Sequence, residues 1–567
     1  MAEYYLNISR FVDDNRALSV GRVNESLCNA IDVTMSEYKS FIIELEKLHI
    51  NNRLHLQLLW YHIQSIMQIL EVFNRIAVNI SKQGLRGGAT LSYLIETSYQ
   101  YLYDRTHINL FKHLIKQASI PYMESIKEWI FNGNIFDPFD EFMIIEKDNL
   151  SFKDCQSLEQ WEKKYQIRHI SIPSFLNNSS NEIWKAGLYL NVVRENIVES
   201  NRVNLAEIED IKYSSKVNKY LDIIKRAYIH SSSSLLYYML DKYKLVQRFG
   251  LMKKYFLIQQ GDFIAQILDT CDKELCKPVF DIIPSRLKTL VDMAIRGTEC
   301  TLSDDITISL QSQDLWNQVT RILAVNSSMT TGEQDQKNVS LNSKLTGYES
   351  FTLNINCKWP VSFLFNTRVI SSYQMLFRLL FYCKHVEHCL LKVWIIDQTL
   401  RKQTVVNQKH YSIFFSLRHR MIYFIQNIQY YMMEEAIEPN WIQFQQQLKQ
   451  INSNIYSIDH LLEHHKIFLD KCISDCLLSN SIIFPIFMKL LALCKEFATL
   501  IIENENKLVN METNEKDEFM NIILKSEREF HQYYMNLLTS ITEFAPSQTG
   551  NKILEILQRA NFNHYFI

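Results

Sequence analysis

The sequence SSYQMLFRLLFYCKHVEHCLLKVW, residues 371–394, and the later sequence LRHRMIYFIQNIQYYMMEEAIEPNW, residues 417–441, decide the fold of this chain. In both, the large apolar residues recur at alternating steps of three and four, which places them on one face of an α-helix. The first stripe is Leu376, Leu379, Cys383, Val386, Leu390 and Val393, and the second is Leu417, Met421, Phe424, Ile428 and Tyr431. Pro439 lacks a backbone donor and ends or restarts the second helix. The pattern therefore predicts two long amphipathic helices joined by the polar connection 401–409.

A third long helical pattern lies near the N-terminus, after a first amphipathic helix over residues 24–50. Its apolar positions alternate four and three without a break: Leu59, Ile63, Ile66, Leu70, Phe73, Ala77 and Ile80. Gly84 follows the last of them, where a glycine commonly ends a helix. We therefore expect a long bundle helix that stops just before Gly84.

The composition predicts a predominantly helical protein with more than one domain. A chain of 567 residues is too long for one hydrophobic core. The 12 glycines and 9 prolines are too few for the turns of a many-stranded protein. The 60 Lys and Arg residues nearly balance the 62 Asp and Glu residues, so the formal net charge is -2. This balance gives no electrostatic reason to bind nucleic acid or an anionic membrane.

The cysteines and the N-terminus are typical of a cytosolic protein. The 11 cysteines are scattered and form no CxxC spacing, so we expect small, reduced hydrophobic residues. The first residues, MAEYYLNISRFVDDNR, contain an early acid and no apolar core, unlike a signal peptide. The longest run without Asp, Glu, Lys or Arg is Leu54–Leu70, which is shorter than the ~20 apolar residues of a membrane span. We therefore expect no membrane insertion.

Two motifs contain residues that bind ligands in other proteins, but neither has the required spacing. The glycines of the first motif are Gly84, Gly87 and Gly88. A phosphate cradle needs a preceding strand and a following GK[ST], both absent here, so a helix–helix turn is favoured. The acids of the second motif are Asp137, Asp140 and Glu141. Their spacing does not match D-x-[DN]-x-[DN]-G-x5-E, the pattern of a calcium loop.

Histidines and cysteines on two predicted helices raise the question of a zinc site. One group is Cys383, His385, His388 and Cys389, and the other is His460, His464, His465, Cys472 and Cys476. The HExxH pattern is absent, and each residue has a simpler role in the core or on the surface. Asp262 lies near a helix break without a second carboxylate or histidine to work with, so a structural role is favoured over a catalytic one. We expect no bound metal, no cofactor and no catalytic centre.

The chain divides by composition into two predicted helical domains, residues 1–245 and 246–567. The polar stretches 199–215 and 231–234 lack a dominant apolar stripe, which places the boundary between 200 and 250. Residues 326–344 contain almost no large apolar side chains, and we expect a mobile insertion there. The stretch Leu353–Phe365 is the one credible β-prone segment.

Several of these sequences resemble the gamma-tubulin complex component family, and most closely its second-component branch, which includes spindle pole body components. The resemblance is strongest in YQMLFRLLFYCKHVE (373–387), LRHRMIYFIQNIQYYMM (417–433) and EPNW (438–441). It continues in LRGGATLSYL (85–94), SIPYMESIKEWIFNGNIFDPFDEFM (119–143), KKYFLIQQGDF (253–263) and SRLKTLVDMAIR (285–296). Motifs in matching order along nearly the whole chain make this a specific signal.

The resemblance implies an all-α fold, an elongated rod of stacked helical bundles with two halves. By the same likeness, the N-terminal half packs laterally against a homologous component, expected to be of the component 3 type. The C-terminal half binds gamma-tubulin, and the assembly templates microtubule nucleation at a microtubule-organising centre, a centrosome or spindle pole body. The implied role is that of a non-catalytic cytoskeletal scaffold at the microtubule minus end. Composition alone fits a helical tethering or adaptor subunit of a vesicle-trafficking complex equally well.

The sequence also departs from the family pattern. Gln259 stands where the family usually has Asp, and Glu434 stands where a large apolar residue is usual. The chain starts close to its first family-like motif, so we expect the family's long N-terminal extension to be missing or short.

Because tubulins are acidic, basic residues off the apolar stripes of the central helices are the candidates for facing gamma-tubulin. These candidates are Arg368, Arg378, Lys384, Arg418 and Arg420. Ordinary solvated charges are the alternative interpretation for each of them.

Overall fold

A computed structural model describes most of the chain as two compact units. The described residues are 1–16, 21–51, 53–101, 103–147, 158–196, 211–214, 219–297, 305–326, 345–403, 408–449, 457–504, 513–544 and 559. Unit 1 comprises Met1–Lys242 and Asn454–Asp459, and unit 2 comprises Tyr243–Ser453 and His460–Ile567. The predicted insertion 326–344 lies outside the described residues except for Asn326.

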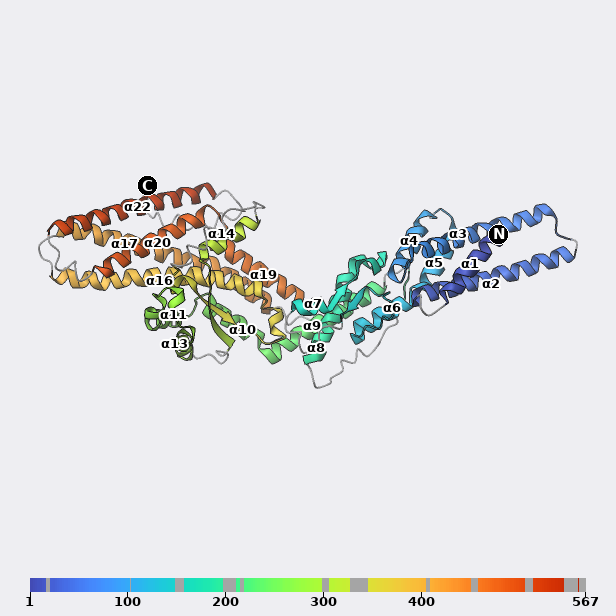
Figure 1. Ribbon diagram of the computed structural model, residues 1–567, viewed down its shortest axis with the longest axis horizontal. Coiled ribbons are helices and arrows are strands. Elements are labelled where there is room, and N and C mark those ends of the chain that lie inside the picture. The colour runs from blue at the N-terminus through green and yellow to red at the C-terminus, as the bar shows by residue number, and fades with distance from the viewer. Residues whose placement is uncertain are drawn as a thin grey trace. The chain divides into compact units, whose positions relative to one another are not determined.

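The predicted all-α fold is confirmed, because helices dominate both units (Figure 1). The strands among the described residues form two small two-stranded sheets. None of the described helices is both long enough and apolar enough to span a bilayer.

Unit 1 begins with a bundle of helices around α2 and α3. Its elements are α1 (Ala2–Asn15), α2 (Arg22–Ile50), α3 (Leu56–Gln83), α4 (Gly88–Gln100), α5 (Arg105–Ala118), α6 (Ile120–Lys127) and a π-helical turn, Glu128–Asn132. α1 packs on α3, and α2 packs on α5. The stripe of α3 is buried from Leu70 to Ile80, and the helix ends at Gly84 with φ 59°, as predicted. Left-handed backbone at this position favours glycine.

The remainder of unit 1 is organised around Trp129. Its elements are β1 (Ile144–Glu146), α7 (Leu158–Lys164), β2 (Tyr165–Ile167), the short 3-10 helices His169–Ser171 and Ser174–Ser179, α8 (Ser180–Asn196) and α9 (Lys219–Tyr243). β1 and β2 pair antiparallel. The indole of Trp129 is fully buried and donates a 2.9 Å hydrogen bond to the carbonyl of Ile183. A Cβ at Gly187 would lie 2.1 Å from this ring, so only glycine lets α8 approach it.

Unit 2 opens with short helices and a small sheet. These elements are α10 (Leu245–Leu251), the π-helical turn Met252–Phe256, α11 (Gly261–Thr270), α12 (Asp272–Leu275), the 3-10 turn Val279–Asp281, α13 (Pro284–Arg296), β3 (Ile306–Leu310), α14 (Leu315–Asn326), α15 (Gly347–Ser350), β4 (Phe351–Ile355) and the 3-10 turn Val361–Phe363. β4 overlaps the start of the predicted β-prone segment. Its antiparallel partner β3, residues ITISL, was not predicted.

The long helices of unit 2 form its core. They are α16 (Thr367–Gln403), α17 (Gln408–Tyr430), the π-helical segment Tyr431–Ile437, α18 (Glu438–Lys449), α19 (Ile458–Asp475), α20 (Ile483–Glu503) and α22 (Thr513–Phe544). α16 packs against α17 and α20, and α20 packs against α22 (Figure 1). Every residue of the two predicted stripes is buried, so the central pair of helices is confirmed. Pro439 lies in the first turn of α18, but the chain stays helical through the π-helical segment before it, so no break occurs there.

One property of α16 differs from the prediction, because this helix is buried on more than one face. Phe377 and Phe381 lie off the predicted stripe, yet both are fully buried. They pack on Phe351 of β4, at ring-centroid distances of 5.9 and 5.2 Å. The sheet therefore covers a face of α16 that the apolar spacing alone left to solvent. Gln259 and Glu434, the two departures from the family pattern, are exposed and disturb no core.

Candidate functional site

Arg378, expected on an exposed face, is an interior residue with 4% of its surface accessible. Its guanidinium donates at 3.2 and 2.6 Å to the Glu349 carbonyl, at 2.7 Å to the Gln313 carbonyl and at 2.8 Å to Oε1 of Gln318. Burial lowers its pKa to about 10. The expectation that Arg378 faces a partner is wrong, because these bonds hold the residues beside β3 and β4 against α16.

Two further candidates are engaged within unit 2. Arg418 is 12% exposed, and its Nε lies 2.7 Å from Oδ2 of the buried Asp397, so α17 is tied to α16. Arg420 is 19% exposed and forms an ion pair with Glu527 of α22. A cation held in this way is a poor contact for a partner, since binding would first have to break the internal pair. The exposed position predicted for both residues is therefore wrong.

The remaining two candidates reach the surface. Lys384 is 32% exposed and pairs with Glu387 on its own helix at 3.0 Å. Arg368 lies exposed in the first turn of α16. Their role towards gamma-tubulin stays a prediction.

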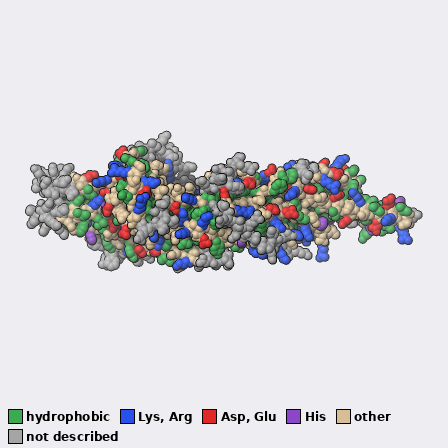
Figure 2. Space-filling model, turned by 90° about the horizontal axis from the view of Figure 1, so that it is seen from below, with side chains coloured by type: hydrophobic (Ala, Val, Ile, Leu, Met, Phe, Trp, Pro, Cys, Tyr) green, Lys and Arg blue, Asp and Glu red, His purple; other side chains and the backbone are tan. Residues whose placement is uncertain are grey.

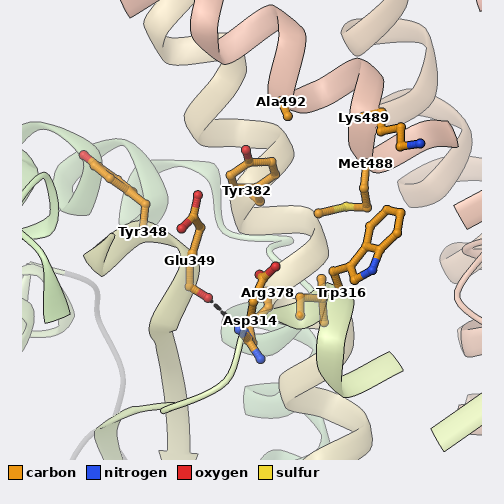
Figure 3. Close-up of a pocket in the computed structure, with 10 residues that line it drawn as sticks. Asp314, Trp316, Tyr348, Glu349, Arg378, Tyr382, Met488, Lys489 and Ala492 are labelled. Carbon is orange, nitrogen blue, oxygen red and sulfur yellow. Dashed lines mark hydrogen bonds between the residues drawn. The ribbon is translucent and has the colours of Figure 1, made fainter. Parts of the chain in front are cut away.

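A pocket of about 200 Å³ lies beside Arg378, between α14, α15, α16 and α20. Figure 3 shows Glu349, Tyr382, Met488 and Trp316 around it, with Arg378 and Asp314 together at one end. The Glu349 carboxylate accepts from the amide of Thr346 at 3.2 Å and from Nζ of Lys495 at 2.9 Å.

Asp314, the second acid of this pocket, also stabilises the folded structure. Asp314 accepts the first backbone amides of α14, while burial, and then the charge of Glu349, raise its pKa. Both carboxylates thus stabilise helix ends.

The glycine motif and the acidic loop of unit 1 are parts of one contact. The carboxylate of Glu141, 7% exposed, accepts from the amides of Arg22 at 2.8 Å and Val23 at 3.3 Å, at the start of α2. Burial raises its pKa, and the amides of Val23, Arg22 and Gly87 oppose this rise. A Cβ on Gly87, at φ +56°, would lie 2.4 Å from the Glu141 carbonyl. The predicted turn between two helices is confirmed, because Gly84 to Gly87 join α3 to α4. The amide of Gly87 faces the Glu141 carboxylate.

The other two acids of this loop have internal partners as well. Asp137 accepts the amides of Glu141 at 2.9 Å and Phe142 at 2.8 Å, and Asp140 pairs with Arg168 at 3.0 Å. These acids shape the loop and tie it to the chain around Arg168.

The histidines that raised the question of zinc are placed as core and surface residues. His465 is buried among aromatic rings, with its Nε2 2.9 Å from the hydroxyl of Tyr373. His385 stacks on Tyr348 with a centroid distance of 3.5 Å. Burial lowers the pKa of His385 and the pKa of His465 to about 3. Among the described residues, no three His, Cys, Asp or Glu side chains gather as a metal site requires. Asp262 is exposed in the first turn of α11.

An exposed apolar surface of unit 1 lies at the C-terminal end of α2 and the N-terminal end of α3, which follow each other in the sequence. We call it the hairpin surface; its exposed members are Ile42, Ile43, Ile50, Leu56, Leu58, Trp60 and Tyr61. Leu56 is 83% and Trp60 is 61% exposed, and both line a groove of about 420 Å³. α3 carries no charged residue between Leu54 and Leu70, a signal in the sequence that could have identified this surface.

A second exposed apolar feature lies on α13 and the turn before it in unit 2. We call it the α13 surface; it comprises the apolar side chains of Phe280, Ile283 and Met293 and the basic side chains of Arg286, Lys288 and Arg296. Exposed apolar side chains that stand singly are common on protein surfaces, and no contact joins these three. Sequence analysis identified the motif at residues 285–296 but not its exposed face.

Two family models together match almost the entire chain. The model described as gamma tubulin complex component N-terminal matches residues 1–242, and that described as gamma tubulin complex component C-terminal matches residues 245–566. The two matches meet where the two compact units divide.

Curated relatives carry names from the same family. The chain is 36% identical to gamma-tubulin complex component 2 of Mus musculus, over 88% of this chain and 54% of that protein. It is 30% identical to the gamma-tubulin complex component 2 homolog of Drosophila melanogaster, over 100% of this chain and 68% of that protein. It is 26% identical to spindle pole body component alp4 of Schizosaccharomyces pombe, over 97% and 82%. The chain thus spans about half the length of the mouse relative and two thirds of the Drosophila one.

Proposed function

Since this chain belongs to the gamma-tubulin complex component family, we propose that it is a non-catalytic scaffold subunit of a gamma-tubulin complex. In this proposal, unit 2 binds gamma-tubulin and unit 1 contacts a homologous component of the component 3 type. Lateral repetition of such pairs templates microtubule nucleation at a microtubule-organising centre, such as a centrosome or spindle pole body. The observation that carries the proposal is the pair of family matches that together span residues 1–242 and 245–566.

The hairpin surface supports the lateral contact. When two helices pack side by side, part of the apolar surface of each stays exposed, and stable bundles cover that part with further helices. Trp60 and Tyr61 are 61% and 73% exposed, and these residue types dominate the binding energy of many protein interfaces. A homologous component that lays its own helices against α3 would cover these side chains.

A scaffold role is also supported by the use of polar groups within the fold. The buried charges described above cap helices, as Glu141 does, or tie elements together, as Arg378 does. Such groups stabilise a rigid framework on which partners can be held at fixed spacing.

Co-purification tests the proposal. The tagged full chain is co-expressed with untagged gamma-tubulin, captured by its tag and passed over a sizing column. We expect both proteins in one peak at equal molar amounts. A folded chain that elutes alone, or that captures vesicle-tethering subunits from cells instead of gamma-tubulin, would contradict the proposal.

A further inference from the structure

The outer face of α5 in unit 1 carries charge of one sign only. This helix contains no acidic residue, and the nearest acids in the sequence, Asp104 and Glu124, lie outside it. Its exposed cations are Arg105, Lys112 and Lys116, and none of them forms an ion pair with another described residue. We call these three residues the α5 basic stripe. Over the face drawn in Figure 2, by contrast, Lys and Arg side chains are interspersed with Asp and Glu.

The three cations of the α5 basic stripe lie on one side of the helix. An α-helix turns by about 100° per residue, which places Arg105, Lys112 and Lys116 within about 40° of one another. The buried residues Phe111 and Leu114 lie on the far side, where α5 packs on α2. At a rise of about 1.5 Å per residue, the cations follow each other along the axis at intervals of about 10.5 and 6 Å. The stripe is therefore narrow, straight and about 17 Å long.

This arrangement of charge opposes the stability of the helix that carries it. Lys112 and Lys116 are like charges four residues apart, which repel each other across one turn. Arg105 occupies the first turn, where the positive end of the helix dipole disfavours a cation. The carboxylate of Asp104, which caps the helix, accepts from the amide and the hydroxyl of Thr106 at 3.0 and 2.8 Å. Local rules are broken in this way at functional surfaces, where the charges are needed for binding and not for folding.

Two exposed tyrosines precede the α5 basic stripe in the chain. Tyr103 is fully exposed, and Tyr99 in the last turn of α4 is 63% exposed. The turn that carries Tyr103 is held against α5, because Tyr101 stacks on His107 and Phe111 at ring-centroid distances of 5.3 and 5.7 Å. Exposed aromatic rings beside cations supply the contact area that charge attraction alone lacks.

We propose that the α5 basic stripe is a docking surface for an acidic, extended peptide segment of a partner protein. An extended chain advances about 3.3 Å per residue, so acids two and three residues apart are spaced by about 6.6 and 10 Å. These spacings match the two intervals between the cations of the stripe. A nucleic-acid site commonly neutralises about 6–10 phosphates, and a membrane-binding cluster uses about 4–8 cations, so three cations favour a peptide. The stripe is separate from the hairpin surface and adds a further class of partner to the proposed function.

Fluorescence anisotropy of a labelled decaglutamate peptide, titrated with the full chain at low and at physiological salt, tests the proposal. The wild type should bind the peptide, and its affinity should fall as the salt concentration rises. Arg105→Glu with Lys112→Glu should raise the dissociation constant by about tenfold or more, because one cation of the stripe remains. The same variant should keep or slightly raise the melting temperature, since it replaces repulsion between residues 112 and 116 by attraction and removes a cation from the first turn. A purely structural role would instead lower the melting temperature.

A matched control lies on α1 and α3, two other helices of unit 1. Arg10 and Lys82 are exposed there, so Arg10→Glu with Lys82→Glu changes the net charge by the same amount away from α5. This control should bind decaglutamate like the wild type. The milder pair Arg105→Gln and Lys112→Gln serves if the charge reversal lowers stability, and it should still weaken binding and its salt dependence.

Three results would overturn the proposal. The first is a wild-type chain that does not bind decaglutamate at low salt. The second is binding that the α5 variants leave unchanged, or that the control weakens equally, because overall charge would then explain it. The third is tighter binding of the wild type to a labelled decauridylate RNA or to phosphatidylserine vesicles at the same salt, which would make phosphate groups the occupant. None of these results bears on the proposed function, which co-purification with gamma-tubulin tests separately.

Discussion

The hydroxyl of Tyr373 on α16 lies 2.9 Å from Nε2 of His465 on α19, in a part of unit 2 from which water is excluded. Phe249 and Phe444 also contact this imidazole, at centroid distances of 5.0 and 5.6 Å. Burial lowers the pKa of His465 from 6.5 to about 3, so the folded protein holds it neutral. A histidine of this kind links the stability of unit 2 to pH.

Acid should destabilise the wild type through His465. Between pH 6.5 and 3 the unfolded chain binds a proton that the folded chain does not, so this contribution is complete above pH 6.5 and is lost as the pH falls. From pH 7 to pH 5 the loss is about 2 kcal/mol of unfolding free energy. His465→Gln should reduce the pH dependence measured by urea unfolding, while His385, whose pKa is also lowered to about 3, keeps its own share. The control Tyr373→Phe keeps His465 and should therefore keep the dependence of unfolding free energy on pH. If His465→Gln shows the same pH dependence as the wild type, His465 does not link stability to pH.

Removal of the buried cation on α16 should destabilise unit 2. Arg378→Met leaves the Glu349 and Gln313 carbonyls without their donor and removes a positive charge that favours the ionised form of Asp314. We expect a loss of about 3 kcal/mol, the scale found when one member of a buried polar network is deleted. Arg368→Met on the exposed first turn of the same helix is the control and should change stability little. Equal melting curves for the two variants would show that Arg378 does not hold the network.

The two glycines at the ends of the turn between α3 and α4 differ in backbone conformation and in close contacts. Gly84 and Gly87 have similar positive φ values of 59° and 56°, but only a Cβ at Gly87 would meet the Glu141 backbone. Gly84→Ala should cost about 1 kcal/mol, because Gly84, with ψ 36°, has ordinary left-handed helical backbone and open space around it. Gly87→Ala should cost about 3 kcal/mol or more, because Gly87, with ψ -122°, lies outside that region and its Cβ would also clash with Glu141. Thermal unfolding measures both. If the two variants are equally stable, the contact with Glu141 is not tight.

The hairpin surface predicts a selective loss of lateral assembly. Trp60→Glu with Leu56→Glu places charges in an exposed groove, so folding should be unaffected while the buried area of a protein contact is disrupted. In co-expression with a component 3 homologue and gamma-tubulin, the variant should lose the homologue and keep gamma-tubulin. Tyr237→Glu, on an α9 position that is 40% exposed, is the matched control. Loss of both partners, or of neither, would contradict the assignment.

The sequence predicted the central helices because their stripes follow the helical period closely. It failed at Arg378 because a three-four spacing identifies one buried face and cannot reveal that Gln313, Gln318 and Glu349 cover another. The link between Glu141 and the start of α2 joins residues more than 110 positions apart, and no local pattern encodes such a contact. The exposed side chains of α13 were not predicted, because the sequence does not distinguish an exposed methionine such as Met293 from a buried one. Only the packing of α13 on α11 shows which of its faces is buried.

The central claim is that the two units have different partners, and cross-linking mass spectrometry on the wild-type complex tests it most directly. The full chain is reconstituted with gamma-tubulin and a component 3 homologue, and its lysines are cross-linked to those of both partners. We predict cross-links from gamma-tubulin to lysines of unit 2, and from the homologue to lysines of unit 1, including Lys39 and Lys47 on α2. Gamma-tubulin cross-linked to unit 1, with the homologue cross-linked only to unit 2, would contradict the account.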